Sequence, residues 1–504
     1  MDIFCKIVII KLGVIIININ INTDNGQLHK TYANRVLISQ VLSDLNLQHD
    51  MPCSGKGICG KCKVKITGDA SLPTSVELNK LSKEELRGNI RLSCQTYALG
   101  DVTIDYNASA INLQGVTYGV MPTFIKSPIT STDKCKGVAI DIGTTTIAAY
   151  LYSFPECICT KTICEKNLQT KFGSDVISRI EYALQGGSKE LQKAITSQIE
   201  NIISKLTPEI PDTIVITGNT IMLHFLTGLS AEGIAKYPFT PESLFGIWQG
   251  RTYLPRCISS YVGADITTAI IASDMLKDKT SFLVDIGTNG EMALWHEGML
   301  RCCSTAAGPA FEGAGISHGM IASSGAINRV YLIGTQIHYE TIDDISAKGI
   351  CGTGVIDAIS CMKTLGIIDE TGYMEEDFQI GSSNVFITPA DIRAVQLAKS
   401  AISAGIDTLL YECKISYSQI EKFYIAGGFG AYIDKNSAAN IGLIPKEILE
   451  KVVVLGNAAG NGAAVLLQSR EMLEKSEEIA KSAISVELSE SPVFMDKYLS
   501  NMMF

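Results

Sequence analysis

Apolar and polar residues are arranged differently in the first hundred residues and in the rest of the chain. Stretches rich in Ile and Val at Lys6–Ile21 and Gln27–Tyr32 favour β-strands, and Leu37–Leu47 has the apolar spacing of a helix. Two more strands are expected at residues 62–68 and 102–106. The pattern therefore predicts a small unit of strands with one helix in this first part of the chain.

Beyond residue 136, short turns rich in Gly and Thr lie between pairs of apolar strands. The stretch 137–152 reads "GVAIDIGTTTIAAYLY", and the stretch 281–296 reads "SFLVDIGTNGEMALWH". A strand, a tight turn and a second strand predict a β-hairpin. Such a turn exposes backbone N–H groups and hydroxyls to an anion, and an Asp at its edge can hold Mg²⁺ directly or through water. The two stretches align, pairing Asp141 with Asp285, Gly143 with Gly287 and Thr144 with Thr288.

Length and charge narrow the classes of protein that fit. The 504 residues are enough for about three domains or for two unequal ones. Lys and Arg number 42 against 52 Asp and Glu, and this net charge of −10 argues against a nucleic-acid-binding surface as the main function. The most apolar stretch, Ile7–Ile21, contains Lys11 and Asn18 and is too interrupted to span a membrane. The odd number of cysteines, 15, favours a reducing cytoplasm over a disulfide framework. We therefore expect a cytoplasmic protein with no nucleic-acid or membrane partner.

Four of the cysteines are spaced like the ligands of a metal centre. Three lie in one short loop and the fourth follows later, in the pattern C-x5-C-x2-C-x31-C. Four thiolates can hold an iron–sulfur cluster or a zinc ion, but a zinc ribbon more often has two C-x-x-C knuckles, and only one is present. The loop also nearly spells a phosphate-binding P-loop, but a cysteine stands where the Mg²⁺-binding Ser or Thr is required. We expect an iron–sulfur cluster, and its ligands are Cys53, Cys59, Cys62 and Cys94.

This loop and its surrounding strands resemble the 2Fe–2S ferredoxins of the β-grasp fold. The first gap has one residue more than the plant-type spacing, as in adrenodoxin-type ferredoxins. The resemblance implies that residues 1–106 form a β-grasp domain and that the cluster is of the 2Fe–2S type. Residues 107–134 mix Ser, Thr, Pro and Gly without a sustained period and are expected to form a linker.

The pair of hairpins resembles the superfamily of actin, sugar kinases, acetate kinase and 70-kDa heat-shock chaperones. That superfamily uses two ribonuclease-H-like subdomains hinged around ATP. Its two connecting helices match Tyr261–Ser273 and Gly456–Ser469, and its adenosine motif matches Phe423–Asp434, all in the order of the superfamily. The resemblance implies a multidomain protein of α+β and α/β class, in which residues 135–504 form an ATPase of two related subdomains with a hinge near residues 260–275 and 456–469.

The superfamily motifs also imply roles for individual residues. Asp141 and Asp285 are expected to position Mg²⁺ and the attacking water, with Asp265 as a further ligand of metal or water. Glu291 either orients water or is a surface carboxylate at the end of the strand. The residues expected to bind the nucleotide are Gly143, Thr144, Thr145, Thr146, Gly287, Thr288, Asn289 and Gly290 at the phosphates, and Gly427, Gly428, Phe429 and Gly430 at the adenosine.

A ferredoxin domain fused to this ATPase resembles the reductive activators of corrinoid proteins. The segments Thr217–Leu229, Cys303–Ile316 and Gly349–Ile359 are similar to the C-terminal domain of that family. The resemblance implies an enzyme that reduces inactive cob(II)alamin to cob(I)alamin by one electron through its cluster, coupled to ATP binding and hydrolysis. The implied partners are the corrinoid protein of a methyltransferase system in anaerobic metabolism and a low-potential electron donor, and the resemblance suggests a homodimer.

Two alternatives stay open at this point. One is an ATP-dependent electron donor to a different low-potential acceptor, and the other is a redox-sensing ATP-binding regulator without turnover. One departure from the family is also expected. Long members carry a middle domain between the linker and the ATPase, whereas here only residues 107–136 separate the ferredoxin stretch from the first hairpin, so we expect that domain to be missing.

Overall fold

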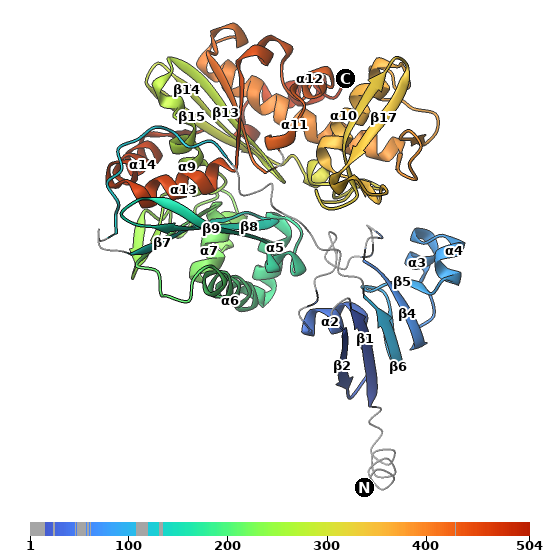
Figure 1. Cartoon of the computed structure of the whole chain (residues 1–504). Coiled ribbons are helices and arrows are strands. Elements are labelled where there is room, and N and C mark those ends of the chain that lie inside the picture. Colours follow the sequence, from blue (N-terminus) through green and yellow to red (C-terminus); the bar gives the residue numbers. More distant parts are fainter. Residues whose placement is uncertain are drawn as a thin grey trace. The chain divides into compact units, whose positions relative to one another are not determined.

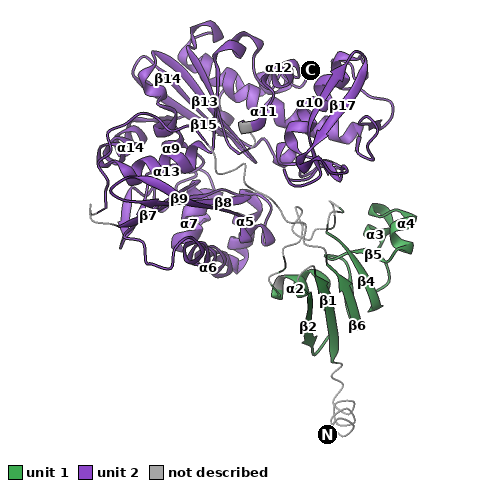
Figure 2. Ribbon diagram, viewed as in Figure 1, with its two compact units in different colours: residues 1–110 green, residues 111–504 purple. Residues whose placement is uncertain are grey.

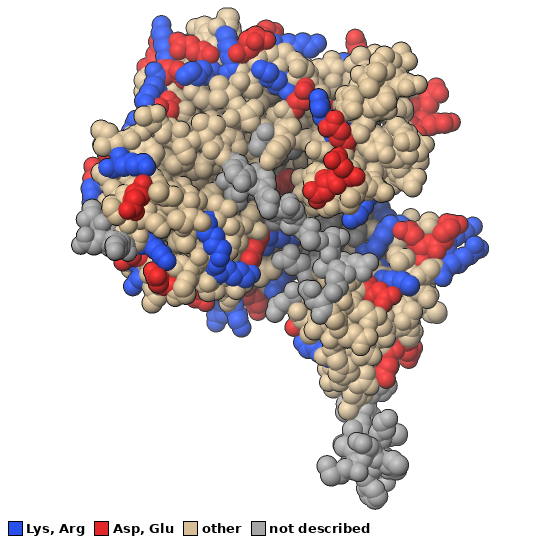
Figure 3. Space-filling view, in the orientation of Figure 1, with Lys and Arg blue, Asp and Glu red and all other residues tan. Residues whose placement is uncertain are grey.

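The computed structural model describes residues 16–23, 26–45, 47, 57, 60, 62–106, 119–130, 135–428 and 430–504. The chain divides into two compact units, residues 1–110 and residues 111–504 (Figure 2). Within the described ranges, no helix has the length and apolar character needed to cross a bilayer. On the face shown in Figure 3, Lys and Arg side chains are interspersed with Asp and Glu.

The first unit is a β-grasp sheet with one helix across it (Figure 1). Its strands follow the order β2-β1-β6-β4-β5, and β3 pairs with β6. The first strand pairs antiparallel with β2 and parallel with β6. Ile17, Ile19 and Ile21 alternate toward the core, as expected for a strand with one covered face. The elements are β1 (Ile17–Thr23), β2 (Gly26–Tyr32), β3 (Val36–Leu37), α2 (Ile38–Asp44), β4 (Lys63–Ala70), α3 (Ser75–Lys80), α4 (Lys83–Arg87), β5 (Ile90–Leu92) and β6 (Tyr97–Asp105).

These elements confirm the β-grasp architecture that the sequence predicts. The part of the predicted strand before residue 16 lies outside the described residues. The short helices α3 and α4 were not predicted, although each begins with a capping box, at Thr74 and at Ser82.

The second unit begins with a six-stranded sheet in the order β11-β12-β10-β7-β8-β9. Strands β7 and β8 form the hairpin predicted from residue 137 onward. Helices cover one face of this hairpin (Figure 1). The elements of this half are β7 (Lys136–Ile142), β8 (Thr146–Ser153), β9 (Ile158–Lys166), α5 (Val176–Tyr182), α6 (Ser188–Leu206), β10 (Thr213–Gly218), α7 (Thr220–Thr227), α8 (Glu232–Ala235), β11 (Ile247–Gln249) and β12 (Thr252–Leu254).

A second six-stranded sheet, in the order β22-β21-β13-β14-β15-β23, contains the other predicted hairpin. Its strands are β13 (Thr280–Ile286), β14 (Gly290–His296), β15 (Met299–Thr305), β21 (Lys422–Ala426), β22 (Val452–Gly456) and β23 (Ile484–Ser485). This half also carries a region that the sequence did not predict, made of β16 (Ala326–Ile333), β17 (Gln336–Thr341), β18 (Gly349–Ile350), α10 (Gly352–Thr364), β19 (Phe378–Gln379) and β20 (Phe386–Ile387). The remaining helices are α11 (Pro389–Cys413), α12 (Lys435–Asn440), α14 (Arg470–Ser482) and α15 (Phe494–Ser500).

Two helices lie between the sheets, α9 (Ala264–Ser273) and α13 (Ala458–Gln468) (Figure 1). They correspond to the two connecting helices expected from the sequence. Their backbones approach closely because the facing residues are small, and a Cβ on Gly462 would lie 1.9 Å from the backbone oxygen of Thr268. Side chains of both helices and both sheets share one hydrophobic core, to which Ala139 of β7 and Leu283 of β13 contribute. The two halves are thus packed together through this helix pair.

Part of the expected linker is hydrogen-bonded to the strand before α13 and to the end of α13. Residues 119–130, which we call the strap, run along α13 and into its junction with α14. The backbone N–H of Val120 donates to Leu455, the N–H of Ser127 donates to Gln468, and the N–H of Arg470 donates back to Ser127, at 2.9–3.1 Å. Residues 107–118 and 131–134 of the same stretch lie outside the described residues.

Candidate functional site

Two of the four predicted cluster ligands lie side by side in the first unit. The Sγ of Cys62 donates a hydrogen bond to the Sγ of Cys94 at 3.2 Å, and both side chains are buried without a disulfide between them. The neighbouring Cys94 thiol, together with burial, raises the pKa of Cys62. Cys53 and Cys59 lie outside the described residues. Two thiols that are not joined by a disulfide and lie this close suit two ligands of one metal atom, so the described pair fits the chemistry of a thiolate-bound cluster.

A buried ion pair holds the turn that carries Cys94. The guanidinium of Arg91 donates to both carboxylate oxygens of Glu77, each at 2.9 Å, and the backbone N–H of Leu92 and the hydroxyl of Thr96 donate to the same carboxylate. Burial acts to raise the pKa of Glu77, but these hydrogen bonds outweigh it and hold that pKa below its usual value. A carboxylate with this many donors fixes residues 91–96, and so the position of the ligand between them.

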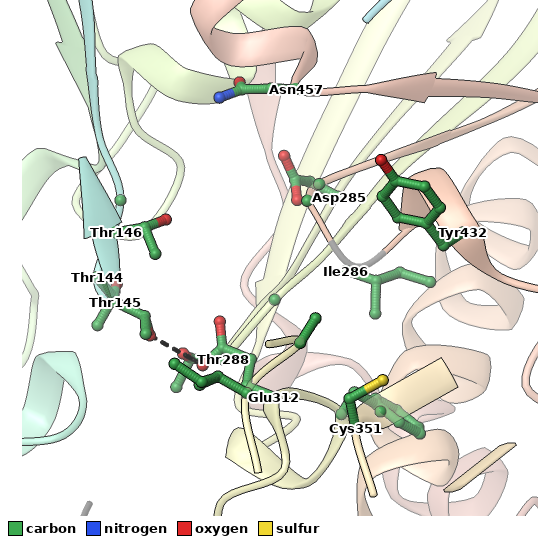
Figure 4. Close-up of a pocket in the computed structure, with 18 of the residues that line it drawn as sticks. Thr144, Thr145, Thr146, Asp285, Ile286, Thr288, Glu312, Cys351, Tyr432 and Asn457 are labelled. Atoms are coloured by element: carbon green, nitrogen blue, oxygen red, sulfur yellow. Dashed lines mark hydrogen bonds between the residues drawn. The ribbon is translucent and has the colours of Figure 1, made fainter. Parts of the chain in front are cut away.

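The second unit contains a cavity of about 440 Å³ between its two halves. It is lined by both hairpins, by the start of α9, by the turn after β21 and by the start of α13 (Figure 4). The predicted site residues found in its wall are Asp141, Gly143, Thr144, Thr145, Thr146, Asp265, Asp285, Gly287, Thr288, Asn289, Glu291, Gly427 and Gly428. Gly290 and Gly430 do not line it: they pack against Ile402 and Ile425 respectively. Phe429 lies outside the described residues.

The first hairpin is supported from behind by buried polar side chains. Arg179 of α5 is fully buried and donates to the backbone oxygens of Thr144 and Gly173. The side chain of Asn167 donates to the oxygen of Gly143 at 2.9 Å. Burial lowers the pKa of Arg179 to about 9, although the charges of Asp175 and Glu312 oppose the fall. The turn is therefore fixed by donors to its carbonyl groups, and Thr144, Thr145 and Thr146 line the cavity.

The second hairpin has a different register and different neighbours. Ile286 pairs with Gly290, so three residues form the turn, whereas four residues, 143–146, separate the last pair of the first hairpin. As a result, Asp285 lies directly across from Glu291, and both side chains are on the same face of the sheet. Gly427 approaches so closely that a Cβ there would lie 2.6 Å from Oδ1 of Asp285. Glu291 is therefore buried beside Asp285, which contradicts the alternative of a surface carboxylate.

Carboxyl groups from both halves gather in this cavity and raise one another's pKa. Burial, and then the charges of Asp265, Asp141 and Glu312, raise the pKa of Asp285 to about 8. Burial and the charge of Asp265 raise the pKa of Asp141 to about 7. Burial raises the pKa of Asp265 to about 6, and burial with the charges of its neighbours raises that of Glu291 well above its usual value. An anionic cluster of this kind is relieved by a cation, which lowers the cost of ionising each group.

The cluster alone does not make a complete metal site. Among the residues that the structure describes, no three His, Cys, Asp or Glu side chains are placed to hold a metal ion by themselves. Mg²⁺ commonly keeps several waters and is bound through one or two carboxylates together with phosphate oxygens of a substrate. The arrangement of Asp141 and Asp285 fits that mode, in which a nucleotide supplies the missing ligands.

One residue of the site was missed in the sequence. Glu312 belongs to a short helical turn, Pro309–Glu312, and its Oε2 accepts hydrogen bonds from Thr145 at 3.0 Å and from Thr288 at 2.7 Å (Figure 4). It thus connects the two hairpins across the cavity. Burial raises its pKa, although the two hydroxyls and the charge of Arg179 oppose the rise. A single Glu in a Gly-rich loop carries no local signal of this role.

Comparison with known families and proteins agrees with this geometry. The family model "2Fe-2S iron-sulfur cluster binding domain" matches residues 22–99. The model "RACo middle region" matches residues 136–278, and the model "C-terminal domain of RACo the ASKHA domain" matches residues 279–504. The boundary between the last two falls between the two halves of the second unit. The expectation that a middle domain is missing is therefore wrong, because the region with that description is the half that contains the first hairpin.

Two curated proteins and one solved structure are similar over most of the chain. The "Corrinoid activation enzyme RamQ" of Eubacterium limosum is 33% identical over 417 residues, which cover 73% of this chain and 70% of that protein. The "[Co(II) methylated amine-specific corrinoid protein] reductase" of Methanosarcina barkeri is 26% identical over 416 residues, covering 73% and 77%. The structure of a "Reductive activator for corrinoid,iron-sulfur protein" superposes with a TM-score of 0.68 at 27% identity, covering 96% of this chain and 98% of that one.

Proposed function

This chain belongs to the family of reductive activators of corrinoid proteins, and from that premise we propose that it reduces the cobalt of a corrinoid protein from cob(II)alamin to cob(I)alamin in an ATP-dependent reaction. The observation that carries the proposal is that one chain combines paired cluster thiols with a cavity in which two phosphate hairpins face each other. Activation or reduction of a corrinoid protein is the coarser function that the names of the relatives share. The 2Fe–2S domain is supported by the family model that matches residues 22–99.

The first unit is proposed to carry the electron. A 2Fe–2S cluster, when bound, supplies one-electron transfer. Its ligands in this chain are Cys53, Cys59, Cys62 and Cys94. The buried pair Cys62 and Cys94 excludes water from one side of the centre, and the Glu77–Arg91 ion pair holds the turn at Cys94. The electron is proposed to come from a separate low-potential donor.

The second unit is proposed to supply the energy. Each ~59 mV of uphill potential reduces the equilibrium constant of a one-electron transfer tenfold, so a donor that is too weak needs a second source of free energy. The phosphates of ATP are proposed to lie between the hairpin turns, with Mg²⁺ held by Asp141 and Asp285 and with water oriented by Glu291. ATP can drive the transfer only if its affinity differs between two states of the activator–corrinoid complex.

The partner is proposed to be the corrinoid protein of a methyltransferase system. A homodimer through the second unit, suggested by the family resemblance, belongs to the proposal as well. The two alternatives make different predictions. A donor to another low-potential acceptor would hydrolyse ATP without acting on cobalt, and a regulator would bind ATP without transferring electrons in turnover.

The decisive experiment follows the EPR signal of cob(II)alamin under anaerobic conditions. The purified protein is mixed with a corrinoid protein held as cob(II)alamin and with a low-potential reductant, with and without MgATP. We expect the signal to disappear only with MgATP. The variant Cys94→Ser should abolish the effect, and Cys159→Ser, which changes an exposed thiol of the second unit, should leave it intact.

Each other outcome would contradict one part of the proposal or favour one of the alternatives. Loss of the signal without MgATP contradicts the coupling to ATP. Persistence of the signal while ATP is hydrolysed contradicts the corrinoid acceptor and favours another low-potential partner. Binding of ATP with neither hydrolysis nor reduction favours the regulator.

A further inference from the structure

Glu312 binds the two hydroxyl groups that the nucleotide phosphates would need. Thr145 belongs to the turn of the first hairpin and Thr288 to the turn of the second, and both donate to the same carboxylate oxygen. In Figure 4 the two threonines point toward this carboxylate across the cavity. A carboxylate that accepts two hydroxyl donors makes the same contacts as a phosphate oxygen, and such charge-assisted hydrogen bonds are stronger than neutral ones.

The position of this carboxylate overlaps the phosphate cradle of the second hairpin. Its other oxygen, Oε1, lies 3.9 Å from the position that a Cβ on Gly287 would occupy. The carboxylate therefore lies over the glycine of the turn, where an anionic ligand would approach the backbone. A polyphosphate and this carboxylate cannot use the same donors at the same time.

The charges around Glu312 make its position sensitive to an incoming anion. The charge of Arg179, behind the first hairpin, acts on it favourably. The charge of Asp285 interacts with it unfavourably, as it does with Asp141. A triphosphate adds several negative charges to this space, so the repulsion on Glu312 rises when the nucleotide enters.

The backbone at Glu312 is held, so the side chain must be the part that moves. Gly313, which follows it, has φ +77°, and a Cβ there would lie 2.4 Å from the backbone oxygen of Met320. Met320 and the next two residues also line the cavity. Release of the carboxylate is therefore a rotation of the Glu312 side chain beside a loop that lies along the same wall.

We propose that Glu312 is an internal competitor of the nucleotide phosphates. Its carboxylate and the phosphates of MgATP compete for the hydroxyl groups of Thr145 and Thr288. The inference rests on the proposed binding of ATP at this site and adds to it a residue that sets the affinity and couples occupancy to the spacing of the hairpins. Glu312 acts here as a positioning residue and does not take part in the chemistry.

Titration calorimetry with MgATP and, separately, with adenosine tests this competition. Glu312→Ala should bind MgATP about tenfold more tightly than the natural protein, as expected for removing a competing contact worth about one charge-assisted hydrogen bond. Glu312→Gln keeps an acceptor without the charge and should show a smaller gain in the same direction. Adenosine, which has no phosphate, should bind all three proteins equally. Glu297→Gln, at an exposed turn between β14 and β15, is the matched control.

The outcomes separate this inference from the proposed function. If the natural protein binds MgATP and the variants bind it equally or more weakly, Glu312 is no competitor, and weaker binding would make it a ligand of the metal instead. If adenosine also binds the variants more tightly, the effect is a general opening of the cavity and the competition for hydroxyls is wrong. If neither the natural protein nor any variant binds MgATP, the ATP site itself is wrong. Binding by the variants alone would support the competition.

Discussion

The two hairpins of the second unit have similar sequences but different surroundings. In the first, Asp141 lies across from Ala148, and the turn is supported by Arg179 and Asn167 through its carbonyls. In the second, Asp285 lies across from Glu291, because the turn is one residue shorter between the last paired positions. A one-residue change of register moves side chains to the other face of a strand, so similar sequences here present different chemistry.

The difference suggests a division of roles between the halves. The first hairpin is a rigid support whose donors face the cavity, with a buried guanidinium behind it. The second hairpin holds the carboxyl groups whose pKa values are raised most, whereas Glu312 accepts a hydrogen bond from the turn of each hairpin. The following predictions test whether the hairpins are equivalent, as their sequences suggest, or distinct, as their environments indicate.

The largest difference is expected between the two aspartates. Asp285→Asn should lower the turnover of ATP-dependent cob(II)alamin reduction by about 10²–10⁴-fold, because Asp285 is proposed to hold Mg²⁺ across from Glu291, which orients the water. The range is that for losing a positioned acid or base. Asp141→Asn should act mainly by raising the KM for MgATP, because the residue across from it is the uncharged Ala148. The measurement is kcat and KM for both variants, with Asp496→Asn at an exposed site as the control.

Equal losses of kcat in the two variants would contradict a division of roles. That result would mean that the hairpins act symmetrically on the nucleotide despite their different registers.

A smaller effect is expected from adding a methyl group to each turn. A Cβ on Gly143 would lie 2.8 Å from the backbone oxygen of Thr146, whereas the nearest atoms to a Cβ on Gly287 are 3.9 Å away. Gly143→Ala should therefore lower the free energy of unfolding by about 1–3 kcal/mol, as overpacking does. Gly287→Ala should change it by less than about 0.5 kcal/mol. Denaturant unfolding of the two variants measures the difference, and equal costs would show that the turns are equally tight.

The smallest difference between the two hairpins is expected in the pH dependence of stability. Carboxyl groups whose folded pKa is raised stabilise the protein fully below their unfolded pKa, near 4, and lose that contribution as pH rises through the folded value. For Asp141 and Asp285 these values are about 7 and about 8. Without nucleotide, thermal stability should therefore fall between about pH 4 and pH 8.

Variants at the two positions separate the contributions. Asp285→Asn should reduce the fall in thermal stability. Between pH 7 and pH 8, the thermal stability of Asp285→Asn should differ from that of the natural protein by more than the stability of Asp141→Asn does. Thermal unfolding from pH 4 to pH 9 measures both curves. If the stability of the natural protein instead rises steadily over this range, the pKa values of the two carboxyl groups are not raised.

Local patterns allowed much of this fold to be predicted. The Asp-Ile-Gly-Thr turns were visible twice because turn chemistry depends on a few neighbouring residues. The four-cysteine spacing indicated a cluster for the same reason, and the structure places Cys62 and Cys94 together. The region from β16 to β20 was not predicted, because its strands are short and carry no repeated pattern.

The features missed in the site depend on contacts between distant residues. Glu312 meets Thr145 across 167 positions of the chain, and nothing beside it in the sequence indicates that contact. Arg179 lies 35 positions from Thr144 and looks like any charged residue of a surface helix until its burial is known. The alignment of the two hairpins was correct as a sequence alignment. The register inside each turn depends on backbone conformation, which the sequence alone does not reveal.

The strap has a mechanical consequence within the second unit. Residues 119–130 are hydrogen-bonded to the strand before α13 and to the end of α13, and this helix lies between the two sheets. If the halves turn about this helix pair when nucleotide binds, a point near the axis changes its orientation but travels only a short distance. The strap lies at such a point. A nucleotide-driven rotation would therefore reach the strap as a change of angle, with little displacement.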